Sequence, residues 1–225
     1  MKKLITLFLA MNFAISCVPN DIEKTEKQDP YEKINRQVFE FNRSFDKTFL
    51  TPMAKTYQAI VPKMLSKCIS HAFLNLEEIN TIANDLLQLR LIYAAEDSWR
   101  FVINSTLGLG GCFDIAEKFD LEKRPQSFGT TLKTWGLSNG SYIVIPFLGA
   151  STTMNSPGLF LKFYVFDPIR FVNDHQFVLQ TVRVLDKRVQ LFPLDAAIDN
   201  AFDPYILYKD AYLQNQAQNF KKISQ

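Results

Sequence analysis

One pentapeptide, Gly136–Gly140, reads Gly-Leu-Ser-Asn-Gly and matches the Gly-x-Ser-x-Gly pattern of serine hydrolases. In those enzymes the pattern forms a tight elbow that presents the serine hydroxyl to a histidine base. Asp167 or Asp174, and then His175, follow Ser138 in the order that hydrolases use. The elbow needs a buried strand before the serine and a helix after it. Here a polar segment precedes Ser138 and a strand-like run follows, so a phospholipase using Ser138 is kept only as an alternative.

Other chemistry-bearing residues are sparse. The chain has two histidines, His71 and His175, and no Cys/His cluster with zinc spacing. It has no phosphate-binding loop and no dinucleotide fingerprint. The net charge is +2 and the basic residues are scattered, which is unlike a nucleic-acid footprint. We therefore expect no cofactor, no metal centre and no nucleic-acid partner.

The N-terminus carries an export signal. Lys2 and Lys3 precede an apolar run, residues 4–15, that has signal-peptide length and is too short to span a bilayer. The run ends in Ser16 and Cys17, and this ending resembles a bacterial lipobox. The resemblance implies cleavage before Cys17 and acylation of its sulfur and its new amino group; a plain secretory peptide is the alternative. Because residue 18 is valine and not aspartate, the same resemblance implies the outer membrane.

The chain then divides at residue 28. Residues 1–16 are predicted to be the lipoprotein signal peptide, and residues 17–28, polar and charged after Val18, a disordered tether. Residues 29–225 are expected to form a single helical domain, since 47% of the chain is hydrophobic and no second boundary is visible. An oxidising periplasm would permit a disulfide between Cys68 and Cys112. Cys68 lies on an apolar helical face, however, and a buried free thiol is favoured.

The first helix is predicted to start at Asp29-Pro30, a good cap followed by a proline at the first helical position. Apolar residues then recur at steps of three or four and define one face, which periodicity alone assigns to a core helix. The residues of this face are Ile34, Val38, Phe41, Phe45 and Phe49, with Phe39 widening it.

The remaining pattern is mainly helical. Segments 64–76, 77–87 and 92–107 are predicted as separate amphipathic helices, and 176–192 and 204–225 as two more. Segment 128–149 is expected to be irregular and Gly-rich, with a short strand or hairpin arm at 142–145. Segment 157–172 is apolar on nearly every side, which favours lipid contact. The fold class is therefore all-α with one short extended patch.

These segments carry motifs that resemble the VacJ/MlaA family of outer-membrane lipoproteins. The likeness runs from about residue 17 to residue 213, which makes it far more specific than any single motif. The matching blocks are Asp29–Glu32, Asn35-Arg36, Phe39–Asn42, Asn75–Glu78, Asn84–Gln88, Asn104–Gly111, Phe128–Leu132, Gly136, Gly140, Tyr142, Pro146-Phe147 and Asp203–Tyr205.

The resemblance implies a flat ring of amphipathic helices around a central channel, with a short extended hairpin. Such a ring lies in the inner leaflet of the outer membrane, anchored on the periplasmic side. It removes mislocalised phospholipids from the outer leaflet and thereby maintains lipid asymmetry. The implied partners are phospholipids, a trimeric outer-membrane porin and a soluble periplasmic lipid carrier of the Mla system. A purely structural envelope lipoprotein is a further alternative.

The resemblance also implies the site residues. Phe39, Glu40, Phe41 and Asn42 correspond to a first-helix segment that surrounds the family's channel. Gly136, Leu137, Ser138 and Gly140 belong to a mobile hairpin beside that channel, spanning residues 134–142. Glu40 stands where a neutral residue is usual and Ser141 stands where proline is usual, and both departures put the local shape in question.

Overall fold

The computed structural model describes residues 29–138, 140–172 and 174–223. The predicted signal peptide (1–16), the acylated Cys17 and the tether (17–28) lie outside these described residues. Helices make up most of the described chain and a two-stranded hairpin supplies the rest of its regular structure. The predicted all-α class with a short hairpin is confirmed.

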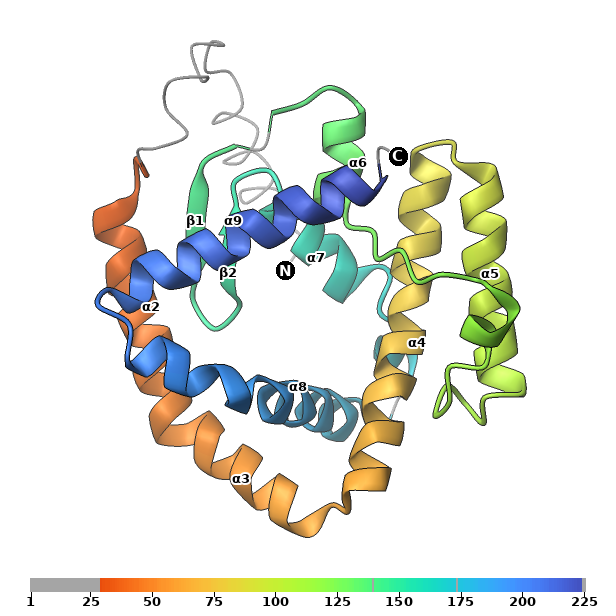
Figure 1. Ribbon diagram of the computed structural model, residues 1–225, viewed down its shortest axis with the longest axis horizontal. Helices are drawn as coiled ribbons and strands as arrows, with labels where there is room; N and C mark the ends of the chain where they lie inside the picture. Colours follow the sequence, from red (N-terminus) through yellow and green to blue (C-terminus); the bar gives the residue numbers. More distant parts are fainter. Residues whose placement is uncertain (1–28, 139, 173, 224–225) are drawn as a thin grey trace.

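The elements keep their order along the chain and are named as in Figure 1. They are α2 (Glu32–Phe45), the π-helical turn η2 (Asp46–Leu50), α3 (Thr51–Ile60), α4 (Lys63–Leu87), α5 (Leu91–Thr106), the 3-10 turn η3 (Ala116–Phe119), α6 (Phe128–Thr134), β1 (Tyr142–Ile145), β2 (Gly149–Thr152), α7 (Ser156–Tyr164), the 3-10 turn η4 (Pro168–Phe171), α8 (Gln176–Asp199) and α9 (Pro204–Ile223).

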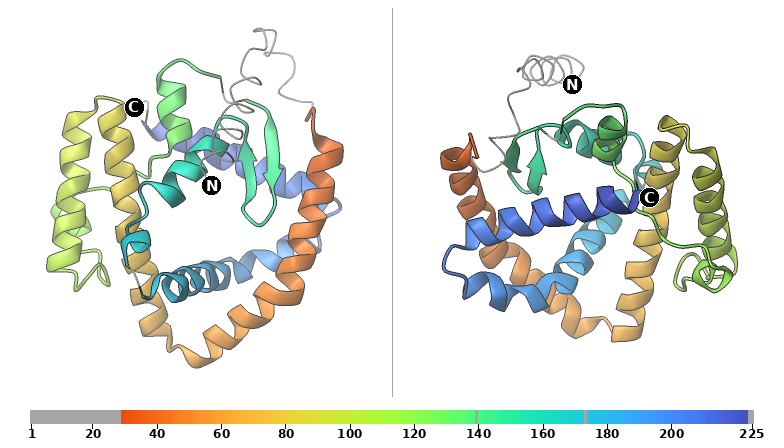
Figure 2. Two further views of the ribbon diagram at one scale, coloured as in Figure 1. Left: turned by 180° about the vertical axis from the view of Figure 1, so that it is seen from behind. Right: turned by 45° about the horizontal axis from the view of Figure 1, so that its top comes forward.

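The helices are arranged as a flat ring (Figure 1). Helix α2, η2 and α3 continue one another as a bent rod, and α4 returns along the opposite side. Helix α8 crosses between them and packs on both α3 and α4, and α9 leads back past the hairpin. Helix α5 lies outside the ring against α4, as both views of Figure 2 show.

Three predicted boundaries are wrong. The segments predicted as two helices, 64–76 and 77–87, form the single helix α4. The acidic residues Glu77 and Glu78 do not interrupt it, because glutamate is a good helix former. Segment 128–149 is not irregular throughout, since it opens with α6, whose Ser127 cap accepts a hydrogen bond from the Thr130 N–H. The strand predicted at 142–145 is β1, and the hairpin therefore follows the Gly-rich stretch 134–142 and does not coincide with it.

The apolar face of α2 points outward, which corrects its assignment to a core helix. Ile34, Phe41 and Phe49 have exposed fractions of 60%, 48% and 57%, whereas Asn35 is buried. Periodicity fixes the angle between the two faces of a helix but not the medium that each face meets. In this ring the inner face is polar and the outer face apolar.

This arrangement extends over the whole ring. The described apolar core is small and centres on Phe39, Tyr142, Val144 and Tyr205. Buried side chains are otherwise mostly polar or charged, while large apolar side chains on α2, α3, α7 and α8 are exposed. A soluble globular protein rarely exposes apolar patches of this extent. Within the described residues no helix combines the length and hydropathy needed to cross a bilayer.

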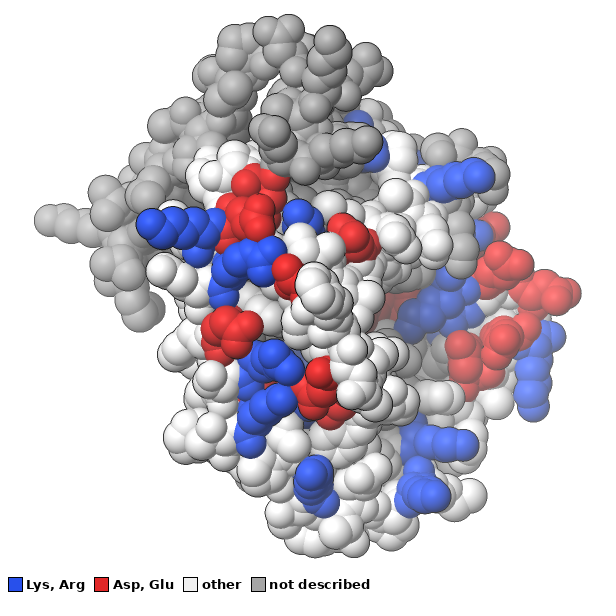
Figure 3. All heavy atoms as spheres, turned by 60° about the vertical axis from the view of Figure 1, so that its left-hand side comes forward, with Lys and Arg blue, Asp and Glu red and all other residues white. Residues whose placement is uncertain are grey.

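Ion pairs interrupt the outward face where α2 meets the C-terminal helices. Arg36 pairs with Asp203 at 2.8 Å, and Asp199 receives both Arg43 (2.7 Å) and Lys47 (2.8 Å). Figure 3 shows basic and acidic side chains interspersed in a band on this side, with uncharged residues around them. The band ties the first helix to the end of α8 and the start of α9.

The expectation of a free thiol at Cys68 is wrong, because Cys68 and Cys112 form a disulfide. Helix α5 packs antiparallel on α4 and brings the Gly-rich loop that follows it next to the middle of α4. A β-carbon added to Gly111 would lie 2.7 Å from the Asn75 side chain. The apolar helical face seen in the sequence could not reveal that another cysteine lies opposite.

Candidate functional site

The inward face of α2 completes the free edge of strand β1. The Asn35 amide donates to the Tyr142 carbonyl (3.1 Å) and accepts from the Val144 N–H (2.9 Å). Asn42 lies seven residues further along α2. Its amide donates to the Ile145 carbonyl at 3.0 Å and accepts a hydrogen bond from the N–H of Phe147 in the hairpin turn. Each primary amide carries a donor and an acceptor, so it can pair as a neighbouring strand would.

Helix α9 holds the other strand. The Tyr208 hydroxyl accepts from the Ala150 N–H at 3.2 Å. A β-carbon on Gly149, whose φ is +85°, would lie 2.6 Å from that hydroxyl, so the contact requires glycine. The Tyr205 hydroxyl donates to Asp29, which links the helix to the start of the described chain. The hairpin is therefore fixed between α2 and α9.

The hairpin turn carries apolar side chains in two directions. Phe147 has a φ of +63° and its ring contacts Phe41 and Phe45 edge-on, with centroids 5.2 and 5.1 Å apart. Its exposed ring extends the outward apolar face of α2. Leu148, the next residue, lines a cavity on the other side.

This cavity has a volume of about 560 Å³, within the usual range for small-molecule sites. One part of its lining is apolar and comes from the hairpin turn and α7, and the other part is polar and comes from the η4 turn and the start of α8. The apolar residues are Leu148, Leu159, Phe160, Phe163 and Tyr164, and the polar ones are Arg170, Gln176 and Gln180.

On the polar side of the cavity, the Arg170 side chain is held in place by Tyr164. The Arg170 guanidinium donates to the Tyr164 carbonyl (3.1 Å) and lies 4.9 Å from the centroid of the same tyrosine ring. It remains exposed, so further donors of the guanidinium are free to meet an anion. A cavity with an apolar wall and one arginine suits a molecule with an acyl chain and an anionic headgroup.

Asp167 organises the polar side and is not available as a catalytic acid. It accepts two hydrogen bonds from Arg183 (2.9 and 3.0 Å) and one from Gln180 (2.6 Å). Burial alone would raise its pKa, but the hydrogen bonds from Arg183 and Gln180 outweigh burial and lower it. Asp167 therefore serves as a buried anchor for α8.

The Gly-x-Ser-x-Gly stretch does not form a hydrolase elbow. Ser138 lies exposed in a coil that follows helix α6 and precedes strand β1, which is the reverse of the required order. Gly136, with φ +88°, ends α6 in a left-handed conformation. At Gly140 a β-carbon would lie 2.2 Å from the Thr153 hydroxyl oxygen, so this glycine closes the base of the hairpin.

The predicted site residues fall into two groups at opposite ends of β1. Phe39 is buried against Tyr205 and Asn42 holds the hairpin turn, while the neighbouring Glu40 and Phe41 are exposed. The second group, the exposed coil containing Leu137 and Ser138, lies at the hairpin base. The structure does not bring the two groups together.

The residues that line the large cavity were not predicted from the sequence. Arg170, Gln180 and Leu148 are far apart in the chain and none belongs to a motif. A usable signal existed for Asn35, because its spacing of seven from Asn42 places both amides on one helical face. Reading that face as the inner one would have required knowing that the outer face meets an apolar medium.

Comparison with known proteins bears on the same region. The model of the family described as MlaA lipoprotein matches residues 27–219. A Rickettsia felis protein is 34% identical over 189 residues, which cover 83% of this chain and 75% of the relative. The Haemophilus influenzae protein named "Intermembrane phospholipid transport system lipoprotein MlaA" is 30% identical, with 95% and 88% covered.

A solved structure shows the same fold. It is described as "Structural basis for maintenance of bacterial outer membrane lipid asymmetry", and its chain is similar with a TM-score of 0.72 and 29% identity. The similarity covers 86% of this chain and all of that one. The family resemblance of the sequence motifs is thus confirmed, and the chain belongs to the MlaA lipoprotein family.

Proposed function

We propose that this protein removes mislocalised phospholipids from the outer leaflet of the outer membrane and passes them to a periplasmic lipid carrier. The observation that carries the proposal is the cavity between the hairpin turn, α7 and α8, which pairs an apolar wall with Arg170. A phospholipid needs such a division, because its acyl chains favour apolar side chains and its phosphate favours a guanidinium. The names of the similar MlaA proteins agree with this activity.

The outward apolar faces support a position in the inner leaflet. Exposed large side chains follow the rod of α2, η2 and α3 (Ile34, Phe49, Ile60) and the segment after α7 (Phe171). A ring of helices that lie in one leaflet needs apolar outer faces at the depth of the acyl chains. The anchor in this proposal is acylated Cys17, with the domain on the periplasmic side.

The partners in this proposal are a trimeric porin around the ring and a soluble carrier of the Mla system below it. The charged band of Figure 3 is a part of the described surface poorly suited to acyl chains. We assign carrier contact to such polar surfaces and porin contact to the apolar rim. No catalytic step is proposed for this chain.

A complementation experiment tests the function. A strain that lacks the protein should accumulate phospholipid in its outer leaflet, and the wild-type chain should restore the normal distribution. We expect Arg170→Glu to fail, because it places a carboxylate where the phosphate should lie. The matched variant Lys118→Glu, on the exposed η3 turn, should restore it. Normal lipid distribution in the deletion strain would contradict the proposal.

The phospholipase alternative has its own variant. Ser138→Ala removes the only hydroxyl of the Gly-x-Ser-x-Gly stretch and should complement as well as the wild type. Loss of complementation together with loss of lysophospholipid release would favour an enzyme. A structural lipoprotein, the third possibility, would bind its partners but carry no phospholipid after purification.

A further inference from the structure

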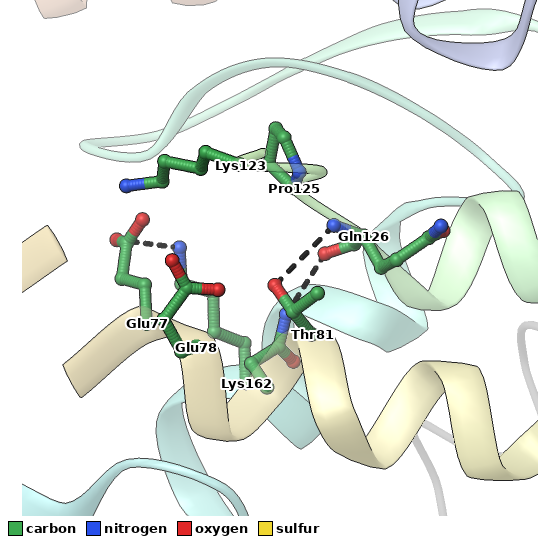
Figure 4. A pocket seen from close by; sticks show the side chains of 8 residues that line it. Glu77, Glu78, Thr81, Lys123, Pro125, Gln126 and Lys162 are labelled. Atoms are coloured by element: carbon green, nitrogen blue, oxygen red, sulfur yellow. Dashed lines mark hydrogen bonds and ion pairs between the residues drawn. The ribbon is translucent and has the colours of Figure 1, made fainter. Parts of the chain in front are cut away.

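A second and smaller pocket is lined by α4, by the loop before α6 and by α7 (Figure 4). Its volume is about 120 Å³, against roughly 10–15 Å³ needed to hold one water molecule. Helix α4 supplies Glu77, Glu78 and Thr81, the loop before α6 supplies Lys123 and Gln126, and α7 supplies Lys162. The lining is polar, in contrast to the apolar wall of the large cavity.

The loop that closes this pocket is fixed to α4. The Thr81 hydroxyl accepts a hydrogen bond from the Gln126 N–H at 3.4 Å. The preceding residue, Asn80, donates from its side-chain amide to the Gln126 carbonyl at 3.0 Å. Both contacts are drawn in Figure 4, where Lys123 extends from the same loop over the two glutamates. The pocket is therefore built by tertiary contacts and is not a gap between surface side chains.

Two of the four charged side chains already satisfy one another. The Lys162 ammonium donates to Glu77 at 2.9 Å. Burial would raise the pKa of Glu77, but Lys162 beside it more than compensates and lowers it, so Glu77 is a carboxylate at neutral pH. Glu78 and Lys123 are therefore the charged groups of this pocket that can still form a hydrogen bond or an ion pair with a ligand.

Glu78 is buried, with 2% of its side chain exposed, and its Oε2 atom has no hydrogen-bond partner within the described residues. Its other oxygen lies 3.5 Å from the Nε of Arg100. Lys123 is exposed and has no hydrogen-bond or ion-pair partner in the described part of the chain. A buried acceptor without a donor is costly, which marks it as a place for a ligand donor.

The charges that line the small pocket restrict which chemical class of ligand it can bind. A simple anion would meet two glutamates, and a simple cation would meet two lysines. The described lining contains no aromatic ring, which argues against a quaternary ammonium, because such groups are bound by aromatic cages and cannot donate to Glu78. Groups of acidic or histidine side chains able to hold a metal are absent from the described residues.

We propose that this pocket binds a phosphoethanolamine group, with its primary ammonium donating to Glu78 and its phosphate facing Lys123. The two-carbon link between ammonium and phosphate matches a pocket that carries both signs of charge. Helix α7 lines the large cavity through Phe163 and the small pocket through Lys162, so both sites share one helix. The inference rests on the proposed function only in taking a phospholipid as the source of the group.

The test is a competition between lipids on the full-length acylated protein in detergent. Native mass spectrometry would measure the ratio of phosphatidylethanolamine to phosphatidylcholine bound from an equimolar mixture, with phosphatidylglycerol as a third arm. We expect at least a roughly tenfold preference for phosphatidylethanolamine, the effect of one charge-assisted hydrogen bond. A ratio near one in the wild type would overturn the proposal while leaving lipid binding, and so the proposed function, intact.

Variants separate the pocket from the fold. Glu78→Gln should bring the ratio close to one. Lys123→Ala, which changes an exposed side chain, should weaken phosphatidylethanolamine binding severalfold without affecting folding, because it removes the cation that faces the phosphate. The matched control Lys118→Ala should keep the wild-type ratio. Unchanged selectivity in Glu78→Gln, or unchanged phosphatidylethanolamine binding in Lys123→Ala, would also overturn the assignment.

A soluble arm distinguishes the sources of the group. Saturation-transfer NMR with glycerophosphoethanolamine and glycerophosphocholine asks whether the headgroup alone binds. Binding of the first only, lost in Glu78→Gln, supports the pocket even if no lipid is retained in detergent, in which case the proposed function would fail separately. Equal signals from both compounds would contradict the proposal.

Discussion

The buried acidic groups beside the two halves of helix α4 differ in their hydrogen bonding. In the first half, the buried Asp186 of α8 accepts hydrogen bonds from Ser66 (3.1 Å), Ser70 (2.7 Å), Gln190 (2.8 Å) and Tyr57 (3.3 Å). In the second half, a buried acidic group lies between α4 and α5, and oxygens of each of its members lack a donor within the described residues. This group consists of Glu78, Asp85 and Asp97.

The two groups differ in whether their buried polar atoms are paired, and therefore in whether they stabilise the fold. A ring with an apolar exterior must fold around polar groups, and these stabilise it only when every donor and acceptor is paired. The Asp186 cluster meets that condition and joins α3, α4 and α8. The acidic group under α5 does not meet it, and this half of α4 borders the proposed headgroup pocket.

Removing the centre of the satisfied cluster should have the largest effect. Asp186→Leu removes the shared acceptor of several partly buried donors, and we expect it to lower the free energy of unfolding by about 4 kcal/mol. Thermal denaturation of the detergent-solubilised protein would measure the change. The control Asp210→Leu, at an exposed position of α9, should stay close to the wild type. Equal stability of the two variants would show that the cluster is not what joins the helices.

Loss of the disulfide should have the next largest effect. The Cys68–Cys112 link closes a loop with a sequence separation of 44 residues. The double variant Cys68→Ser/Cys112→Ser should be destabilised by about 2–4 kcal/mol. Reductant should lower the melting temperature of the wild type but not of the double variant. A melting temperature that reductant leaves unchanged in the wild type would contradict the link.

The acidic group should make stability depend on pH. Burial raises the pKa of Asp97 to about 7, and the neighbouring carboxyl group of Asp85 also raises it. An unfolded aspartate has a pKa of about 3.9, so between about pH 4 and pH 7 the folded chain binds a proton that the unfolded chain does not. The free energy of unfolding should therefore fall as pH rises through this window.

Chemical denaturation at about pH 5 and about pH 8 would measure this slope, with an expected loss of about 1–2 kcal/mol. Asp97→Asn should reduce the loss, because the amide resembles the protonated acid. The lowered pKa values of Asp167 and Asp203 act in the opposite direction but only at more acidic pH. Greater stability of the wild type at the higher pH would contradict the account.

The smallest effect is expected at Glu40, which lies beside the buried Phe39 but is exposed. Glu40→Gln should change the free energy of unfolding by less than about 0.5 kcal/mol. It should also complement a deletion strain, since Glu40 lines neither of the two pockets described above. A marked change in outer-leaflet phospholipid would instead place this carboxylate at the transport path.

The sequence predicted the elements better than their surroundings. Helix α5, strand β1 and the proline start of α9 follow from local periodicity and turn residues, which are properties of a few neighbouring positions. The outward direction of Ile34 and Phe49 depends on the medium around the ring. The disulfide depends on which segment packs against Cys68, and no local pattern records that contact.

The site shows the same division. Motif resemblance singled out Asn42, which holds the hairpin turn, but it did not find the cavity, whose walls come from the turn, α7 and α8. Glu78 was visible as part of an Asn-Leu-Glu-Glu block. That its second oxygen is buried without a donor is a property of the packing of α4, α5 and the loop at Lys123.

Mass spectrometry of the lipids that remain on the purified protein tests the central claim most directly. The account predicts bound phospholipid on the wild type and its loss in Leu159→Trp, which fills the apolar side of the large cavity. The matched variant Phe202→Trp, at a fully exposed position, should retain the lipid. Phospholipid absent from the wild type, or present equally in all three proteins, would contradict the account.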